Sequence, residues 1–384
     1  MTTQPSPGGR AARRRAAALL VAFLVAVECL TVACGQAAPA PAGSSAVGAA
    51  ASTTSASESA SAEPTPYKRK PWPSPTATPE LPSAADVYPG VEAMDVDAQL
   101  VVLPFGDVGY MGVSADSVWA ETTSGLIRID PDDMSVVTVD DQAGFGMFAT
   151  ESAVWVSNFD GATVTRFDPK TASPGVVAKV YGNPNAISVF GDTLWVAQHR
   201  GGAVTRLEEP SGSIVTEIKV GNMGRAGPQG VTATADAVWV GIPNIEAVVR
   251  IDPAANKVVA TIPVTTSPCG GIAATDDAVW VSSCFDDEKI VRIDPRTNAV
   301  VGEFPIGGHN GGPVIVNGYP WFPVGNRLVR INPGTNEVDG VVEFADAFQA
   351  FGTAVGFGSV WVGSIGGRNL ARVPLDVLEN WATP

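Results

Sequence analysis

Seven tryptophans recur at nearly even spacing, and no other feature of the chain constrains its fold as strongly. They are Trp119, Trp155, Trp195, Trp239, Trp280, Trp321 and Trp361. Successive members lie 36, 40, 44, 41, 41 and 40 residues apart. Seven arginines follow them at a near-constant offset: Arg128, Arg166, Arg206, Arg250, Arg292, Arg330 and Arg372. Two residue types that keep one period indicate an internal repeat.

Each repeat contains four short runs with the composition of β-strands. The fifth repeat shows them most clearly, at residues 271–274, 278–283, 290–293 and 299–306, which are rich in Val, Ile and aromatic residues. Asp294-Pro295 separates its last two runs, and similar Asp-Pro or Asn-Pro pairs recur at 130, 168, 252 and 332. Proline presets φ in such a turn and the Asp side chain accepts from backbone N–H groups. Four-stranded units of this length predict an all-β, seven-bladed β-propeller.

The repeats resemble the YVTN and streptogramin (virginiamycin B) lyase-like propeller repeats. Residues 154–158 (VWVSN) with 164–169 (VTRFDP), and 279–281 (VWV) with 291–295 (VRIDP), carry the resemblance. It extends over residues 98–374 and implies the propeller fold. The activity that it implies is a metal-assisted elimination that opens a cyclic ester, which would need a base and a cation such as magnesium.

The ends of the repeat region indicate how the ring closes. The seventh repeat has no clear fourth strand, while residues 98–102 precede the first repeat without a blade of their own. Residues 96–100 also resemble the fourth strand of the sixth repeat at 338–342. The N-terminal strand is therefore expected to complete blade seven, which leaves no free sheet edge at the join.

The start of the chain has the pattern of an export signal. Arg13, Arg14 and Arg15 precede an almost wholly apolar stretch from 16 to 33, which ends in Thr31-Val32-Ala33-Cys34. Small residues before a cysteine resemble the lipobox of bacterial lipoproteins, so residues 1–33 are expected to be a signal peptide and Cys34 its lipidated product. An ordinary cleaved signal beside an incidental cysteine is the alternative. The arginine doublets are also compatible with twin-arginine export.

Residues 34–94 are predicted to be a disordered linker, and residues 95–384 the propeller. The linker is rich in Ala, Ser, Thr and Pro and poor in large aliphatic residues, so it cannot bury enough apolar surface to fold. A basic and aromatic segment, Lys68 to Trp72, interrupts it. The chain carries a net charge of −15, and so strong an acidity argues against nucleic-acid binding, which needs clustered Lys and Arg.

Cys269 and Cys284 are expected to form a disulfide. Exported domains favour disulfides, and these two cysteines remain once Cys29 and Cys34 are assigned to the leader and to lipidation. If Asp276-Asp277 is a two-residue turn, residues that face each other across the hairpin sum to 553, as the two cysteines do. They would then lie within disulfide reach.

Chemistry is expected on the face of the propeller that carries two sets of loops: those that lead into each inner strand and those that join the second and third strands. The candidate binding residues on it are His199, Arg200, Arg225, Asn244, Glu246, Asp286, His309 and Asn310. Polar loops are also what any soluble propeller needs on its rim. No catalytic residue and no metal ligand is assigned, since the sequence contains no nucleophile elbow, zinc motif, P-loop or dinucleotide fingerprint.

Two functions follow from these observations. The first is a monomeric, non-catalytic binding or scaffold propeller, without a cofactor, held on the outer face of the membrane by its lipid. Its partner would be a small molecule, a peptide or an envelope protein. The second is a lyase-like enzyme that uses magnesium and acts on an exported or extracellular small molecule. Only two histidines, His199 and His309, are available for such a site.

Overall fold

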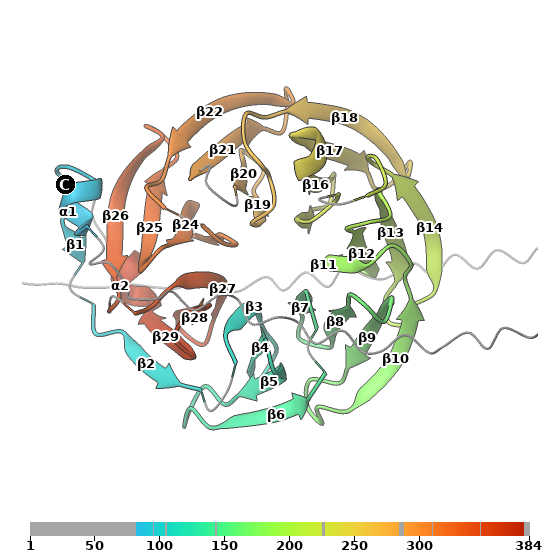
Figure 1. Ribbon diagram of the computed structural model, residues 1–384, viewed down its shortest axis with the longest axis horizontal. Helices are drawn as coiled ribbons and strands as arrows, with labels where there is room; N and C mark the ends of the chain where they lie inside the picture. Colours follow the sequence, from blue (N-terminus) through green and yellow to red (C-terminus); the bar gives the residue numbers. More distant parts are fainter. Residues whose placement is uncertain are drawn as a thin grey trace, which may run out of the picture. The chain divides into compact units, whose positions relative to one another are not determined.

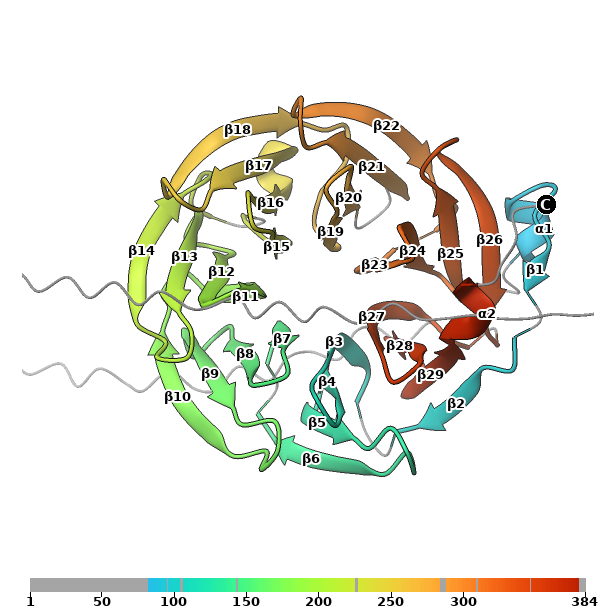
Figure 2. The same ribbon diagram turned by 180° about the vertical axis from the view of Figure 1, so that it is seen from behind.

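Seven radial β-sheets stand around a central axis (Figures 1 and 2). The computed structural model describes residues 82–379 except 95, 104, 105, 143, 225, 226, 284–287, 309 and 346. Within this part the predicted seven-bladed, all-β propeller with four strands per blade is confirmed. The predicted signal peptide, Cys34 and most of the predicted linker lie outside the described residues. None of the described helices has the length and hydropathy of a membrane-spanning helix.

Successive antiparallel strands build each blade from the inside outward. Blade one consists of β3 (Val108–Val113), β4 (Val118–Thr122), β5 (Gly125–Ile129) and β6 (Val136–Asp140). Blade two consists of β7 (Met147–Ala149), β8 (Val154–Asn158), β9 (Thr163–Phe167) and β10 (Pro174–Lys179). Blade three consists of β11 (Pro184–Phe190), β12 (Thr193–Gln198), β13 (Ala203–Glu208) and β14 (Ile214–Lys219). Blade four consists of β15 (Val231–Ala233), β16 (Val238–Ile242), β17 (Ala247–Asp252) and β18 (Lys257–Pro263).

The remaining three blades close the circle. Blade five consists of β19 (Ile272–Ala274), β20 (Val279–Ser282), β21 (Lys289–Asp294) and β22 (Ala299–Pro305). Blade six consists of β23 (Val314–Val316), β24 (Tyr319–Val324), β25 (Arg327–Asn332) and β26 (Glu337–Glu343). Blade seven consists of β27 (Ala350–Gly356), β28 (Ser359–Ser364), β29 (Asn369–Pro374) and, as its outer strand, β2 (Gln99–Val102). The last pairing confirms the predicted closure of the ring.

The repeated tryptophans form the core between the blades. All seven lie on second strands and are at most 1% exposed. The hydrophobic cluster around Trp155, for example, joins Val164 of blade two to Ile187 and Val196 of blade three. A tryptophan at this position therefore buries a large apolar surface against the neighbouring sheet, which explains its recurrence.

Most of the repeated arginines connect their blade to the next one. The Arg206, Arg250, Arg292 and Arg372 guanidinium groups each lie 5.1 Å from the ring centre of the tryptophan in their own blade. Each also donates to a proline carbonyl in the following blade, as Arg206 does to Pro253 O at 2.6 Å. The Asp-Pro turns thus hold the ring together as well as connecting strands, and cation–π stacking supports the contact.

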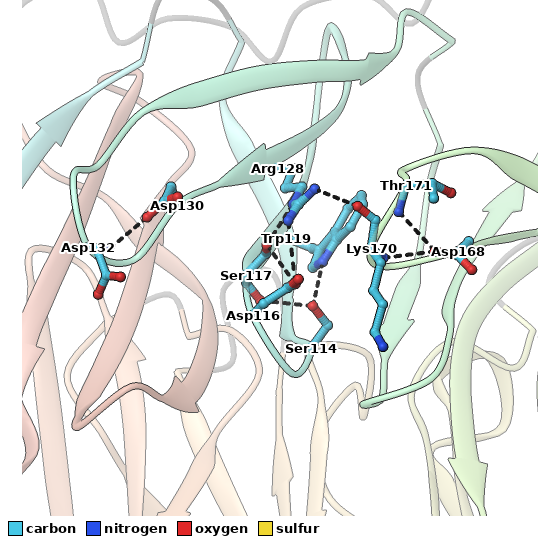
Figure 3. A network of polar contacts seen from close by, with 10 residues as sticks. All are labelled: Ser114, Asp116, Ser117, Trp119, Arg128, Asp130, Asp132, Asp168, Lys170 and Thr171. Atoms are coloured by element: carbon cyan, nitrogen blue, oxygen red, sulfur yellow. Dashed lines mark hydrogen bonds and ion pairs between the residues drawn. The ribbon is translucent and has the colours of Figure 1, made fainter.

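Figure 3 shows this contact between blades one and two. Arg128 Nε donates to Ser117 Oγ at 2.6 Å, and its NH1 donates to Lys170 O at 3.2 Å in the turn of blade two. Asp168 Oδ1 accepts from the backbone N–H groups of Lys170 and Thr171, each at 2.9 Å, and so shapes that turn. The predicted role of the Asp side chain in these turns is confirmed.

The ring has one seam, where the two ends of the propeller meet. Because blade seven takes its outer strand from the chain's start, it has no turn between its third and fourth strands. Arg330 of blade six consequently has no such turn to reach in the next blade. Its Nε instead donates to Asp339 Oδ1 at 2.7 Å within the same blade, where the Arg330 side chain is 3% exposed and that of Asp339 12% exposed. A cavity of about 460 Å³ lies at the seam on blade seven, lined by Asp97, Gln99, Gly358, Ser359, Arg372 and Pro374.

A short segment before the first predicted strand corrects the boundary between linker and propeller. Helix α1 (Ala84–Val87) and strand β1 (Ala93–Met94) lie on blade six, and β1 pairs in parallel with β26. Ala84, Tyr88 and Met94 are buried there, and the Tyr88 hydroxyl donates to Ile306 O. Residues 82–94 thus belong to the folded part although the linker was expected to reach 94. A few apolar side chains are enough to hold this segment in place, because the ring supplies the apolar surface against which they are buried.

Candidate functional site

A β-bulge interrupts every inner strand at the mouth of the ring. In each blade, two inner-strand residues face the one residue that lies two positions after the repeated tryptophan, as register shifts or backbone hydrogen bonds show. The first residues of the bulges are Gly109, Phe145, Asn185, Gln229, Gly270, Gly311 and Phe351. Bulges redirect side chains and often lie beside functional sites. They mark the face with the two loop sets, called here the upper face.

The bulge of blade five removes the register argument for the predicted disulfide, because it lies between the paired strands and Cys269. Residues 272–274 pair with 281–279 in the predicted register, which sums to 553. The bulge at Gly270 and Gly271 then shifts the register by one, since Gly270 N donates to Ser282 O. Cys269 is buried beyond this bulge, and Cys284 lies outside the described residues. The pairing of Cys269 with Cys284 stays a prediction.

Two of the predicted site residues, which are consecutive in the sequence, share one loop of the upper face. His199 and Arg200 lie side by side in the loop between β12 and β13. Asn244 lies in the 3-10 turn η1 (Pro243–Ile245) of blade four, and Glu246 follows it in the left-handed conformation with φ 47°. Asn310 is buried beside blade five, where its Nδ2 lies 3.4 Å from Ser283 Oγ. Arg225, Asp286 and His309 lie outside the described residues.

An aromatic cluster surrounds His199 and Arg200. Phe159, in the loop between β8 and β9, is at its centre. Its ring centre lies 5.0 Å from that of Phe145, 5.6 Å from that of His199 and 5.6 Å from Arg200 Cζ. These distances are typical of favourable aromatic and cation–π contacts. Phe145 and Phe159 remain partly exposed, so the cluster presents an apolar surface beside a cation.

A second aromatic pair continues this surface around the mouth. Tyr110 of blade one and Phe351 of blade seven make an edge-to-face contact with their ring centres 6.4 Å apart. Aromatic side chains therefore lie on the upper face of four consecutive blades, from seven to three. Sequence reasoning missed Phe145, Phe159, Tyr110 and Phe351 as site residues. For Phe145 and Phe351 the first residue of the bulge was the available signal, because a large side chain there differs from the glycine of blades one, five and six.

The surroundings of His199 favour its neutral form. Burial, and secondly the Arg200 charge, lower the pKa of His199 from its ordinary value of 6.5. Its Nδ1 is buried and has no hydrogen-bond partner among the described residues. A neutral imidazole at pH 7 can either donate or accept at its other nitrogen. Among the described residues, no group of three or more His, Cys, Asp and Glu side chains is placed to hold a metal ion.

Known structures share this fold at low sequence identity. A streptogramin B lyase structure is 19% identical, with a TM-score of 0.61, over 72% of this chain and 96% of that one. Virginiamycin B lyase from Staphylococcus aureus is 18% identical, with a TM-score of 0.61, over 73% of this chain and 99% of that one. The WD40 β-propeller domain of Doa1 is 15% identical, with a TM-score of 0.60, over 72% and 97% of the two chains.

These similarities concern the fold. The resemblance to streptogramin-lyase-like propellers, predicted from the repeats, is confirmed at that level. No protein-family model matches the chain, and no curated protein matches it. Identities below one fifth accompany both the lyases and a WD40 domain, so the fold by itself does not distinguish an enzyme from a binding propeller.

Proposed function

We propose that this chain is a non-catalytic binding propeller that is exported and lipid-anchored on the outer face of the cell membrane. The aromatic cluster of Phe145, Phe159 and His199 beside the exposed Arg200 carries the proposal. Exposed aromatic and arginine side chains are the residue types enriched at protein interfaces. A small molecule, a peptide or an envelope protein is the partner that such a surface would take.

A photocrosslinking experiment in intact cells tests the binding role. Benzoylphenylalanine replaces Tyr181 on the upper face in one variant and Phe190 at the opposite end of the same blade in the other; the native side chains are 69% and 48% exposed. We expect discrete adducts from position 181 and none from position 190. Equal labelling from both positions, or none from either, would contradict a binding role for the upper face.

Export and anchoring rest on the leader. The arginines, the apolar stretch to 33 and Cys34 support a lipidated N-terminus, and the Ala, Ser, Thr and Pro-rich residues after it support a tether. A Cys34→Ser variant should lose its lipid and leave the membrane fraction. Normal processing and membrane retention of that variant would rule the anchor out.

The disulfide belongs to the same proposal, because it requires an oxidising compartment. Alkylation of the unfolded, unreduced protein from cells should leave Cys269 and Cys284 unmodified. Modification of both would show that they are thiols and would argue against export.

A lyase is the second candidate, and the fold shared with streptogramin B lyase favours it. Incubation with a cyclic depsipeptide of the streptogramin B class, with and without magnesium, separates the two functions. The binding proposal expects no product in either case. Magnesium-dependent ring opening that is lost in His199→Gln or His309→Gln would support the lyase.

A further inference from the structure

One surface on the upper face of blades two to four stands out from its surroundings. We call it the arginine patch, and it consists of Phe145, Phe159, Tyr181, His199, Arg200 and Met223. Five loops build it, and Figure 1 shows the blades that carry them next to one another. No residue of the patch belongs to the repeated tryptophan and arginine positions, so the blade architecture does not account for it.

Backbone hydrogen bonds hold the outer part of the patch together. Arg200 N donates to Gly182 O at 2.8 Å, and Gly224 N donates to Arg200 O at 3.1 Å. Tyr181 and Met223, the sequence neighbours of these glycines, are thereby placed on either side of Arg200. Their side chains are 69% and 74% exposed. Exposure of two such large side chains on the loops that contact Arg200 leaves apolar surface in water, which is unfavourable.

Arg200 supplies the charge of the patch. Its guanidinium group lies over the Phe159 ring, with Cζ 5.6 Å from the ring centre. A guanidinium group can pair with a carboxylate through two N–H groups while one of its faces contacts an aromatic ring. His199 adds a hydrogen-bonding nitrogen without adding a charge. Asp160, in the loop of Phe159, is exposed, and no ion pair joins it to Arg200 among the described residues. In a chain of net charge −15, an exposed arginine on an apolar surface favours an acidic partner.

We infer that the arginine patch binds a polypeptide segment of another protein in which an acidic side chain lies next to an aromatic or large aliphatic one. This inference rests on the proposed binding function and names its partner. The patch is spread over five loops and includes two highly exposed side chains, Tyr181 and Met223. Such a surface suits a polypeptide segment better than a small molecule, whose binding sites are typically concave. Apolar side chains of the segment would pack on Phe159, Tyr181 and Met223, and its carboxylate would accept from Arg200.

Selection from a random peptide library displayed on phage tests the inference with the full chain as target. Enriched peptides should combine an acidic residue with a neighbouring aromatic or aliphatic one. Synthetic copies of them should bind Arg200→Gln and Phe159→Leu at least about tenfold more weakly, since each variant removes a central contact. Asp160→Asn should strengthen binding, because it removes a repulsive carboxylate.

Matched variants and peptides separate specific effects from general ones. Arg368→Gln removes the same charge from an exposed position on the upper face of blade seven and should leave binding unchanged. Peptides with Gln in place of their Glu should lose affinity for the wild type. Thermal unfolding curves of the Arg200→Gln, Asp160→Asn and Arg368→Gln variants should coincide with that of the wild type, since these three side chains are exposed.

Three results would overturn the inference. Enrichment of peptides without acidic residues would show that charge complementarity does not determine binding. Equal binding by Arg200→Gln and wild type would show that the peptide does not contact Arg200. In both cases the chain still binds peptides, so the proposed function survives. Failure to enrich any peptide would reject a polypeptide partner at the patch, while crosslinking from position 181 would decide separately whether the face binds a partner.

Discussion

At the scale of single residues, the repeated positions and the exceptions to them have different meanings. Tryptophan and arginine recur because every blade must pack on the next one. Asp339 is an exception. The outer strands of blades three to six each contain a bulge next to the residue that pairs with the repeated arginine. Blades three, four and five place an exposed valine at this bulge, namely Val215, Val259 and Val301, whereas blade six places Asp339 there. Blade six needs the carboxylate because Arg330 has no turn to contact in blade seven. The chain thus replaces a lost contact between blades by an ion pair within one.

Removal of Asp339 should strongly destabilise the protein. Asp339→Val removes the carboxylate that accepts from the buried Arg330 Nε, which is expected to lower the free energy of unfolding by about 3–5 kcal/mol. Urea denaturation measures the difference. Val301→Ala, at the same place in blade five, is the control and should cost far less. The double variant Arg330→Met, Asp339→Val should recover part of the loss, and a double variant no better than the single one would contradict this explanation.

The titration of His199 is a second prediction at this scale. Burial and Arg200 lower the pKa of His199, so its NMR titration midpoint should lie below 6.5. Arg200→Gln should raise the midpoint only partly, because burial is the larger cause. The unfolded chain binds this proton more readily than the native one, so His199 reduces stability as the pH falls below about 6.5. A midpoint at or above 6.5 would contradict the buried environment.

At the scale of elements, α1 and β1 attach the chain to the outside of the ring. Besides the pairing of β1 with β26, polar side chains hold them there. Glu343 Oε1 accepts from Ala84 N at 2.8 Å and pairs with Arg327 at 3.0 Å, and the Tyr88 hydroxyl donates to Ile306 O. Burial raises the pKa of Tyr88 to about 12, so its hydroxyl remains a donor even above pH 10, where an exposed tyrosine ionises. Strand β1 of this segment is a fifth strand in the sheet of blade six, which the four-stranded repeat does not contain.

Tyr88→Phe tests this attachment. The substitution removes the donor to Ile306 O and leaves a buried carbonyl without it, which should lower the free energy of unfolding by about 1–3 kcal/mol. Tyr181→Phe removes a hydroxyl from an exposed tyrosine and should change stability little. Chemical denaturation of both variants gives the comparison, and equal effects would show that Tyr88 contributes no specific contact.

At the scale of the whole molecule, closure of the ring depends on β2. Its four residues pair with β29 from Gln99↔Arg372 to Val102↔Asn369 and cover the outer edge of blade seven. Each blade buries its tryptophan against a neighbour, so a ring that opens loses packing on both sides of the break.

A chain that begins at residue 104 should therefore fold poorly. It lacks β2 and the segment before it, which leaves β29 as an exposed edge strand prone to aggregation. Size-exclusion chromatography should show loss of the monomer, compared with a chain that begins at residue 82. A truncated protein that is monomeric and equally resistant to heat would contradict the role of β2 in closure.

The sequence by itself determined the fold, the number of blades, the turns and the closing strand. Each of these leaves its mark in several repeats, because the same packing problem recurs in every blade. Only the tertiary structure decided how far the folded part extends toward the N-terminus, since residues 82–94 resemble a linker until the ring offers them a surface. It also decided which residues form the arginine patch. Phe145, Phe159 and Arg200 come from loops that do not repeat, and their contact depends on how the ring places neighbouring blades.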